Sequence, residues 1–162
     1  RRAGGTGNGV CCAKVSEAEV MVEGEGVALF AYGSMVEPAW AALEELAQNG
    51  IKATLVNARF AKPLDEDLIR RLATRHEVLL AIEEGSTGGF AAHVLQFLAN
   101  EGLLENGLKV RLMTMPDESI DHNKPDTQYE MAGLKAPHIV ANVLTALGRA
   151  DEANPAVLPQ LA

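Results

Sequence analysis

A glycine-rich turn between two carboxylates and an apolar segment is the most distinctive chemical feature of the sequence. Glu83 and Glu84 end an apolar run, and Gly85-Ser86-Thr87-Gly88-Gly89 follows directly. Glycines that lead into a helix let backbone N–H groups point at an anion, and the helix dipole adds to the attraction. Two carboxylates at the entrance would repel a phosphate, and neither the P-loop lysine nor a dinucleotide fingerprint is present. We favour a structural turn built on Gly85, Gly88 and Gly89, with a small-ligand site as the weaker alternative.

The two carboxylates themselves stand where α/β proteins place functional side chains, at the end of an expected parallel strand. Paired carboxylates can work as acid and base when the pKa of one of them is raised. Neighbouring residues of a strand, however, point to opposite faces of the sheet. For Glu83 and Glu84 we therefore favour a structural or interface role, such as capping a helix or binding an arginine.

A second candidate is the segment Asn57-Ala58-Arg59-Phe60-Ala61-Lys62-Pro63-Leu64-Asp65, which leaves one strand and enters a helix. Arg59 and Lys62 could hold a phosphate or a carboxylate. We favour an ion pair between Arg59 and Glu83 or Glu84, so that Arg59→Ala should destabilise the domain. Asp65 stands at the start of the helix.

The remaining reactive residue types form no catalytic or metal-binding pattern. His93, one turn into a helix, is interpreted as a packing residue, and the other histidines have no second ligand at metal spacing. Neither Ser34 nor Ser86 has the glycine pattern of a nucleophile elbow. Cys11 and Cys12 are adjacent and have no other thiol to pair with. The sequence thus predicts no catalytic residue, no metal site and no cofactor site of its own.

The composition of the chain restricts the classes of molecule that it can bind. The formal net charge is -8, and charged residues make up 22 % of the 162-residue chain. An acidic surface argues against nucleic acid and against an anionic membrane. No apolar run approaches the ~20 residues of a membrane span. The length suits one domain with a core of useful size.

The expected elements alternate between strand and helix. This pattern predicts an α/β fold: a three-layer α/β/α arrangement around a mostly parallel, roughly five-stranded sheet. Residues 1–20 are interpreted as a linker or divergent entry segment, 21–148 as the domain, 114–127 within it as a loop, and 149–162 as a flexible tail. Strands are expected at 20–22, 27–32, 51–57, 77–82 and 108–113, and helices at 35–49, 65–75, 90–101 and 137–148.

Several motifs together carry a family resemblance. The 57–65 segment, His76-Glu77-Val78-Leu79 and Glu83-Glu84-Gly85 resemble the C-terminal domain of transketolase-like thiamine-diphosphate enzymes. The continuation is similar specifically to the 1-deoxy-D-xylulose-5-phosphate synthase family. It comprises His93-Val94-Leu95-Gln96-Phe97-Leu98, Gly107-Leu108-Lys109-Val110-Arg111, Pro116-Asp117, Ile120-Asp121-His122, Ala132-Gly133-Leu134 and His138-Ile139-Val140.

The resemblance implies a parent transferase that condenses pyruvate with glyceraldehyde 3-phosphate in isoprenoid (terpenoid) biosynthesis. It also implies that thiamine diphosphate and magnesium are held by two upstream domains, while this domain packs against them and supports a homodimer. A bacterial cytoplasm or a plastid stroma would suit such an enzyme. The alternatives are a stand-alone interaction module and a domain of the 2-oxoacid dehydrogenase β-subunit type.

The entry segment departs from the family. Family members usually enter this domain through Tyr-Pro-Arg-Gly-Asn, whose arginine is implicated in holding the substrate phosphate. Gly7-Asn8-Gly9 keeps the end of this pattern, but Thr6 occupies the arginine position. Residues 1–20 thus either diverged from the family or mark a gene that does not encode a normal full-length synthase.

Overall fold

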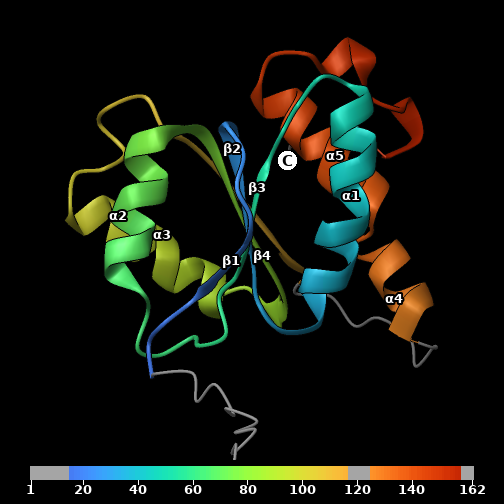
Figure 1. The fold of residues 1–162 in the computed structure, drawn as a ribbon. Coiled ribbons are helices and arrows are strands. Elements are labelled where there is room, and N and C mark those ends of the chain that lie inside the picture. The colour runs from blue at the N-terminus through green and yellow to red at the C-terminus, as the bar shows by residue number, and fades with distance from the viewer. Residues whose placement is uncertain (1–14, 117–124, 158–162) are drawn as a thin grey trace, which may run out of the picture.

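The fold is a central sheet with helices on both faces (Figure 1). It is taken from a computed structural model that describes residues 15–116 and 125–157. The entry residues 1–14, with both cysteines and Thr6, lie outside the described residues, as does His122. The elements are β1 (Glu19–Val22), β2 (Gly26–Ala31), α1 (Val36–Gln48), β3 (Thr54–Asn57), α2 (Glu66–Arg75), β4 (His76–Ser86), α3 (Phe90–Asn100), β5 (Lys109–Met115), α4 (Pro125–Met131) and α5 (Ala136–Ala146). Short 3-10 turns cover Gly33–Met35, Ala150–Glu152 and Pro155–Val157.

The five strands lie in the order β1-β3-β2-β4-β5. The four strands β2 to β5 are mutually parallel, and β1 pairs antiparallel with β3 at the edge. The central strand β2 is buried from Val27 to Ala31 without alternation, because helices cover both faces of the sheet. The prediction of a mostly parallel, five-stranded sheet is confirmed.

Each face of the sheet has its own apolar core. Val27 and Leu29 of β2 belong to the core that α1 and α5 cover. Ala28 and Phe30 belong to the other core, which α2 and α3 cover. This division follows from the pleat, which sends successive side chains to opposite faces. Figure 1 shows the two helix pairs on either side of the strands, so the three-layer prediction is confirmed.

Several boundaries differ from the sequence-based expectations. Strand β3 begins at Thr54 rather than at 51, and β4 continues through the two glutamates to Ser86. Helix α4 begins at Pro125, inside the segment expected to be a loop. Prolines are common in loops, which is why this segment was expected to be one. Proline is also favoured at the first position of a helix, where its missing N–H costs nothing.

The described part of the expected tail packs onto the domain. Ala153 is only 7 % exposed and belongs to the core under α1 and α5. Arg149 donates a hydrogen bond to the carbonyl of Asn49 at 3.0 Å, beyond the end of α1. Residues 149–157 therefore contribute contacts to the fold, whereas 158–162 lie outside the described residues.

The connections that follow the neighbouring strands β2 and β4 run to opposite faces of the sheet. After β2 the chain continues into α1 on one face, and after β4 it continues into α3 on the other face. Because β2 and β4 are neighbours, their carboxyl ends mark the topological switch point of the sheet. In doubly wound folds this topological switch point is the usual place for a ligand.

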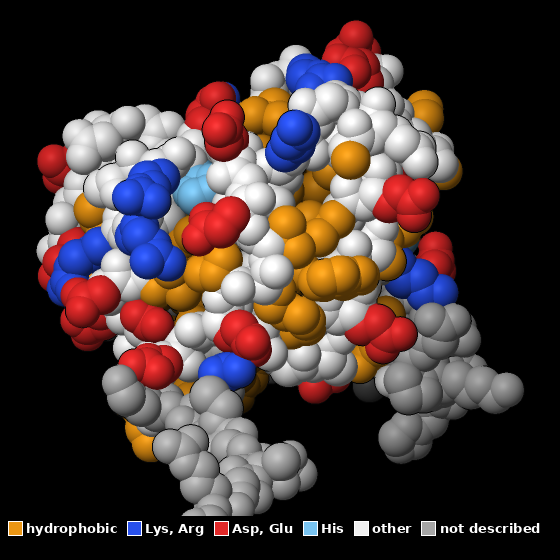
Figure 2. Space-filling model, in the orientation of Figure 1, with side chains coloured by type: hydrophobic (Ala, Val, Ile, Leu, Met, Phe, Trp, Pro, Cys, Tyr) orange, Lys and Arg blue, Asp and Glu red, His pale blue; other side chains and the backbone are white. Residues whose placement is uncertain are grey.

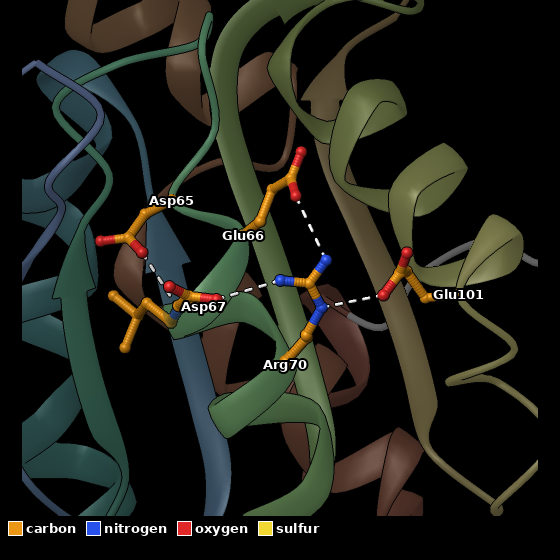
Figure 3. Close-up of polar contacts among 6 residues, drawn as sticks. Asp65, Glu66, Asp67, Arg70 and Glu101 are labelled. Carbon is orange, nitrogen blue, oxygen red and sulfur yellow. Dashed lines mark hydrogen bonds and ion pairs between the residues drawn. The ribbon is translucent and has the colours of Figure 1, made fainter.

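The start of α2 is fixed by Asp65. Its Oδ1 accepts a hydrogen bond from Leu68 N at 3.0 Å, the N-cap arrangement, and its Oδ2 accepts one from Ala18 N at 2.9 Å. Figure 3 shows Asp65 on one side of this helix start and Arg70 on the other, where its guanidinium contacts Glu66, Asp67 and Glu101. One carboxylate thus ties the incoming chain to the helix that follows β3.

We predict that Asp65→Ala lowers the free energy of unfolding by about 1 kcal/mol, the usual cost of losing an N-cap, with a further loss from the freed Ala18 N–H. Asp67→Ala is the matched control, since it removes the same charge from the same helical turn but loses only an exposed ion pair with Arg70, which contributes little stability. Urea unfolding of both variants checks this. An equal loss in the two variants would show that charge, and not the cap, matters.

Candidate functional site

The carboxyl edge of the parallel strands gathers most of the residues singled out in the sequence. Glu83 and Glu84 lie near the end of β4, Ser34 follows β2, and the 57–65 segment follows β3. The antiparallel β1 starts at this edge too, because Glu19 lies opposite Asn57. The question is which of these side chains face one another.

Glu83 is a buried carboxylate, only 4 % exposed. Its Oε2 accepts a hydrogen bond from Phe90 N at 3.0 Å, and its Oε1 accepts one from Ala91 N at 2.8 Å. These are free N–H groups of the first turn of α3, where the helix dipole also favours a negative charge. The Phe90 ring fixes the same turn by packing edge-on against Phe30, with ring centroids 5.1 Å apart.

The glycines of the turn make room for this carboxylate. A Cβ on Gly89 would lie within 2.8 Å of both Glu83 oxygens, and a Cβ on Gly85 would lie 2.7 Å from Oε2. Gly88 has φ of +104°, a conformation that side chains rarely adopt. The turn therefore wraps around Glu83, and the place where an exogenous anion would bind is filled by the chain's own carboxylate.

Glu84 points the other way, to the switch point. The hydroxyls of Ser34 and Tyr129 each donate a hydrogen bond to its Oε2 at 2.6 Å. These two bonds, that of Ser34 first, hold the pKa of Glu84 below its ordinary value, although partial burial acts in the opposite direction. The hydrogen bond to Glu84 raises the pKa of the Tyr129 phenol. The network joins the turn after β2, the end of β4 and helix α4.

Tyr129 was missed in the sequence analysis. It lies 45 residues from Glu84 along the chain, in a helix that had not been expected. No spacing rule connects the two residues. The only available signal was a tyrosine close to an acidic residue, Glu130, which is too common to single out.

The predicted ion pair between Arg59 and Glu83 or Glu84 is wrong. Arg59 instead pairs with Glu19 at 2.5 Å, and the two side chains are 33 % and 49 % exposed. The prediction placed the end of β3 beside that of β4, but β2 lies between them and β1 lies on the other side of β3. Exposed pairs contribute little stability, so the effect expected for Arg59→Ala is small.

Lys62 and His93 come together although 31 residues separate them in the sequence. Both line a hollow of about 290 Å³ between the loop before α2 and the outer face of α3. Lys62 is exposed and His93 is half-buried. The packing of α2 against α3 on one face of the sheet brings them together.

Nothing in the described ranges resembles a metal centre, since no group of three or more His, Cys, Asp or Glu side chains converges there. Within residues 15–116 and 125–157, no helix is long and apolar enough to cross a membrane. The Ser34 hydroxyl donates a hydrogen bond to the Glu84 carboxylate. The hydrogen bonds of Glu83 and Glu84 hold the carboxyl edge of the sheet together.

Known proteins show the same fold and motifs. The profile of the family described as "Transketolase, C-terminal domain" matches residues 16–139. The chain belongs to the transketolase C-terminal domain family. This transketolase C-terminal domain is 51 % identical over 140 residues to 1-deoxy-D-xylulose-5-phosphate synthase 1, chloroplastic, from Oryza sativa subsp. japonica. The match covers 86 % of the chain but only 19 % of the rice protein.

A solved structure shows the same fold. This transketolase C-terminal domain superposes on a chain described as "Split gene transketolase, inactive beta4 tetramer" with a TM-score of 0.76 and 28 % sequence identity. The superposition covers 85 % of this chain and 44 % of that one. In both comparisons the related protein is much longer than the part it shares with this domain.

We predict that Gly89→Ala and Glu83→Ala each destabilise this domain, but that their effects do not add. The first places a methyl group against the carboxylate, a steric cost of about 1–3 kcal/mol. The second removes two hydrogen bonds to a charged acceptor, a cost of about 3 kcal/mol. In the double variant the clash partner is gone. Urea unfolding of the four proteins of the cycle measures the coupling, and strict additivity would contradict the contact.

We predict that the Glu84 network contributes stability in a defined pH window. The pKa of Glu84 is lower in the folded protein than in the unfolded chain. The hydrogen bonds to its carboxylate therefore stabilise the fold fully above the unfolded carboxyl pKa, and this stabilisation is lost as the pH falls through the folded pKa. The pKa of the Tyr129 phenol is higher in the folded protein than in the unfolded chain. Its hydrogen bond to Glu84 therefore stabilises the fold fully below the unfolded phenol pKa, and this stabilisation is lost as the pH rises through the folded pKa. Tyr129→Phe should therefore lose most stability between about pH 5 and 9 and approach the parent protein in acid. Urea midpoints across pH test this, and a difference that does not change with pH would contradict it.

Proposed function

We propose that this chain is the C-terminal domain of a 1-deoxy-D-xylulose-5-phosphate synthase, a transferase that condenses pyruvate with glyceraldehyde 3-phosphate. The 51 % identity to the rice enzyme over most of the chain carries this proposal. The domain packs against upstream domains and supports the homodimer. It contributes no catalytic residue of its own.

In the parent enzyme, thiamine diphosphate with magnesium supplies the nucleophilic carbon for this condensation. The residues of this domain that the structure describes do not fit that cofactor. The glycine-rich start of α3, the place suited to a diphosphate, is occupied by the Glu83 carboxylate. At the switch point, the Ser34 and Tyr129 hydroxyls already donate to the Glu84 carboxylate, whose negative charge would repel a phosphate. The cofactor and substrate sites are therefore assigned to the upstream domains.

The chain spans about a fifth of the rice relative, with 19 % of that protein covered. A parent polypeptide several times longer than 162 residues fits the proposal. The rice protein is described as chloroplastic, which favours a plastid stroma over a bacterial cytoplasm for this chain.

We predict that an antibody against this domain detects a polypeptide several times larger than the 162-residue chain in its source cells. The immunoprecipitated protein should form 1-deoxy-D-xylulose 5-phosphate from pyruvate and glyceraldehyde 3-phosphate. The domain alone should not bind thiamine diphosphate in a calorimetric titration. A native polypeptide of only 162 residues would instead indicate a stand-alone module.

A large product without this activity would point to another branch of the superfamily, such as a 2-oxoacid dehydrogenase β-subunit. Binding of thiamine diphosphate by the domain alone would contradict the assignment of the cofactor site to the upstream domains.

A further inference from the structure

The hollow beside the loop before α2 lies apart from the hydrogen bonds of Glu83 and Glu84. It is about 290 Å³ in volume and is formed by residues 61–64 and the outer face of α3. Half-buried Leu64 and Phe97 give it an apolar part, and Lys62, His93 and Gln96 give it a polar part. An apolar centre with a polar rim is the usual composition of an interface between proteins.

Two polar groups of the hollow, those of Lys62 and His93, lack partners within the described ranges. Among the described residues, neither the Lys62 ammonium group nor the His93 ring has a hydrogen-bond or ion-pair partner. The carboxylate of Glu66, which also lines the hollow, is engaged by Arg70 at 3.2 Å. In a chain of net charge -8, Lys62 thus offers a positive charge that no described carboxylate neutralises.

The hollow lies where the polypeptide enters the domain. The amide of Ala18 is bound to Asp65 at 2.9 Å, and the residues on either side of Asp65, Leu64 and Glu66, line the hollow. Figure 2, in the orientation of Figure 1, shows side chains of both charges around the start of the described chain. The described chain, which begins at residue 15, therefore enters the domain next to this hollow.

We propose that the hollow is the docking surface for the upstream part of the same polypeptide. The surface that fills it presents a carboxylate to Lys62 and an apolar side chain to Leu64 and Phe97. The location of the entering chain and the unneutralised charge of Lys62 carry this inference. It rests on the proposed function, because that function requires upstream domains.

The test uses the full-length protein and the matched pair Lys62 and Lys52. Both lysines are exposed in the structure, but Lys52 precedes β3 at the opposite edge of the sheet. Brief acetylation followed by mass spectrometry compares their reactivity within one molecule. We expect Lys62 to react several-fold more slowly than Lys52, because docking covers it.

Charge reversal at the same two lysines provides a second test. In the full-length protein, Lys62→Glu should speed backbone hydrogen exchange in residues 61–64, whereas Lys52→Glu should leave that segment unchanged. Equal reactivity of the two lysines, or equal exchange in the two variants, would overturn the docking surface.

Two further outcomes identify other occupants. Protection of Lys62 that disappears on dilution would assign the hollow to a second copy of the chain and overturn the proposal. A native polypeptide of only 162 residues would remove the occupant and the proposed function together. Equal lysine reactivity in an active, longer enzyme would overturn only the docking surface.

Discussion

The buried Glu83 carboxylate is the constraint on which the carboxyl edge of this domain depends. A charge that is 4 % exposed is stable only where it is hydrogen-bonded, because desolvation of an unpaired carboxylate is costly. The first turn of α3 supplies two N–H donors for it. This requirement fixes the position of α3 at the end of β4, and it leaves room only for glycine at residues 85 and 89.

The second glutamate shows how one strand serves two purposes. Because successive residues point to opposite faces, Glu84 faces the switch point, where Ser34 and Tyr129 bind it. Both positions at which a doubly wound domain usually holds a ligand are thus filled by side chains of the chain itself. The domain matches 19 % of the length of the rice relative, so it corresponds to one part of a longer protein.

The sequence was informative wherever a local rule sufficed. The strand expected at 27–32 is β2 in the structure, and alternation of strands with helices predicted the parallel sheet. The 57–65 motif predicted a helix start at Asp65, which caps α2. The partner of Arg59 could not be predicted, since it depends on which strands are neighbours, and the order β1-β3-β2-β4-β5 is set by packing of the whole chain.

The sequence by itself determined the fold class, the family and the turn around residues 83–89, because periodicity, glycine positions and motif order are local properties. Only the tertiary structure decided what the charged groups contact. Tyr129 meets Glu84 across 45 residues, and Lys62 shares a hollow with His93. These contacts depend on how helices from distant segments pack on the two faces of the sheet. The short-range spacing of residues in the sequence does not indicate that packing.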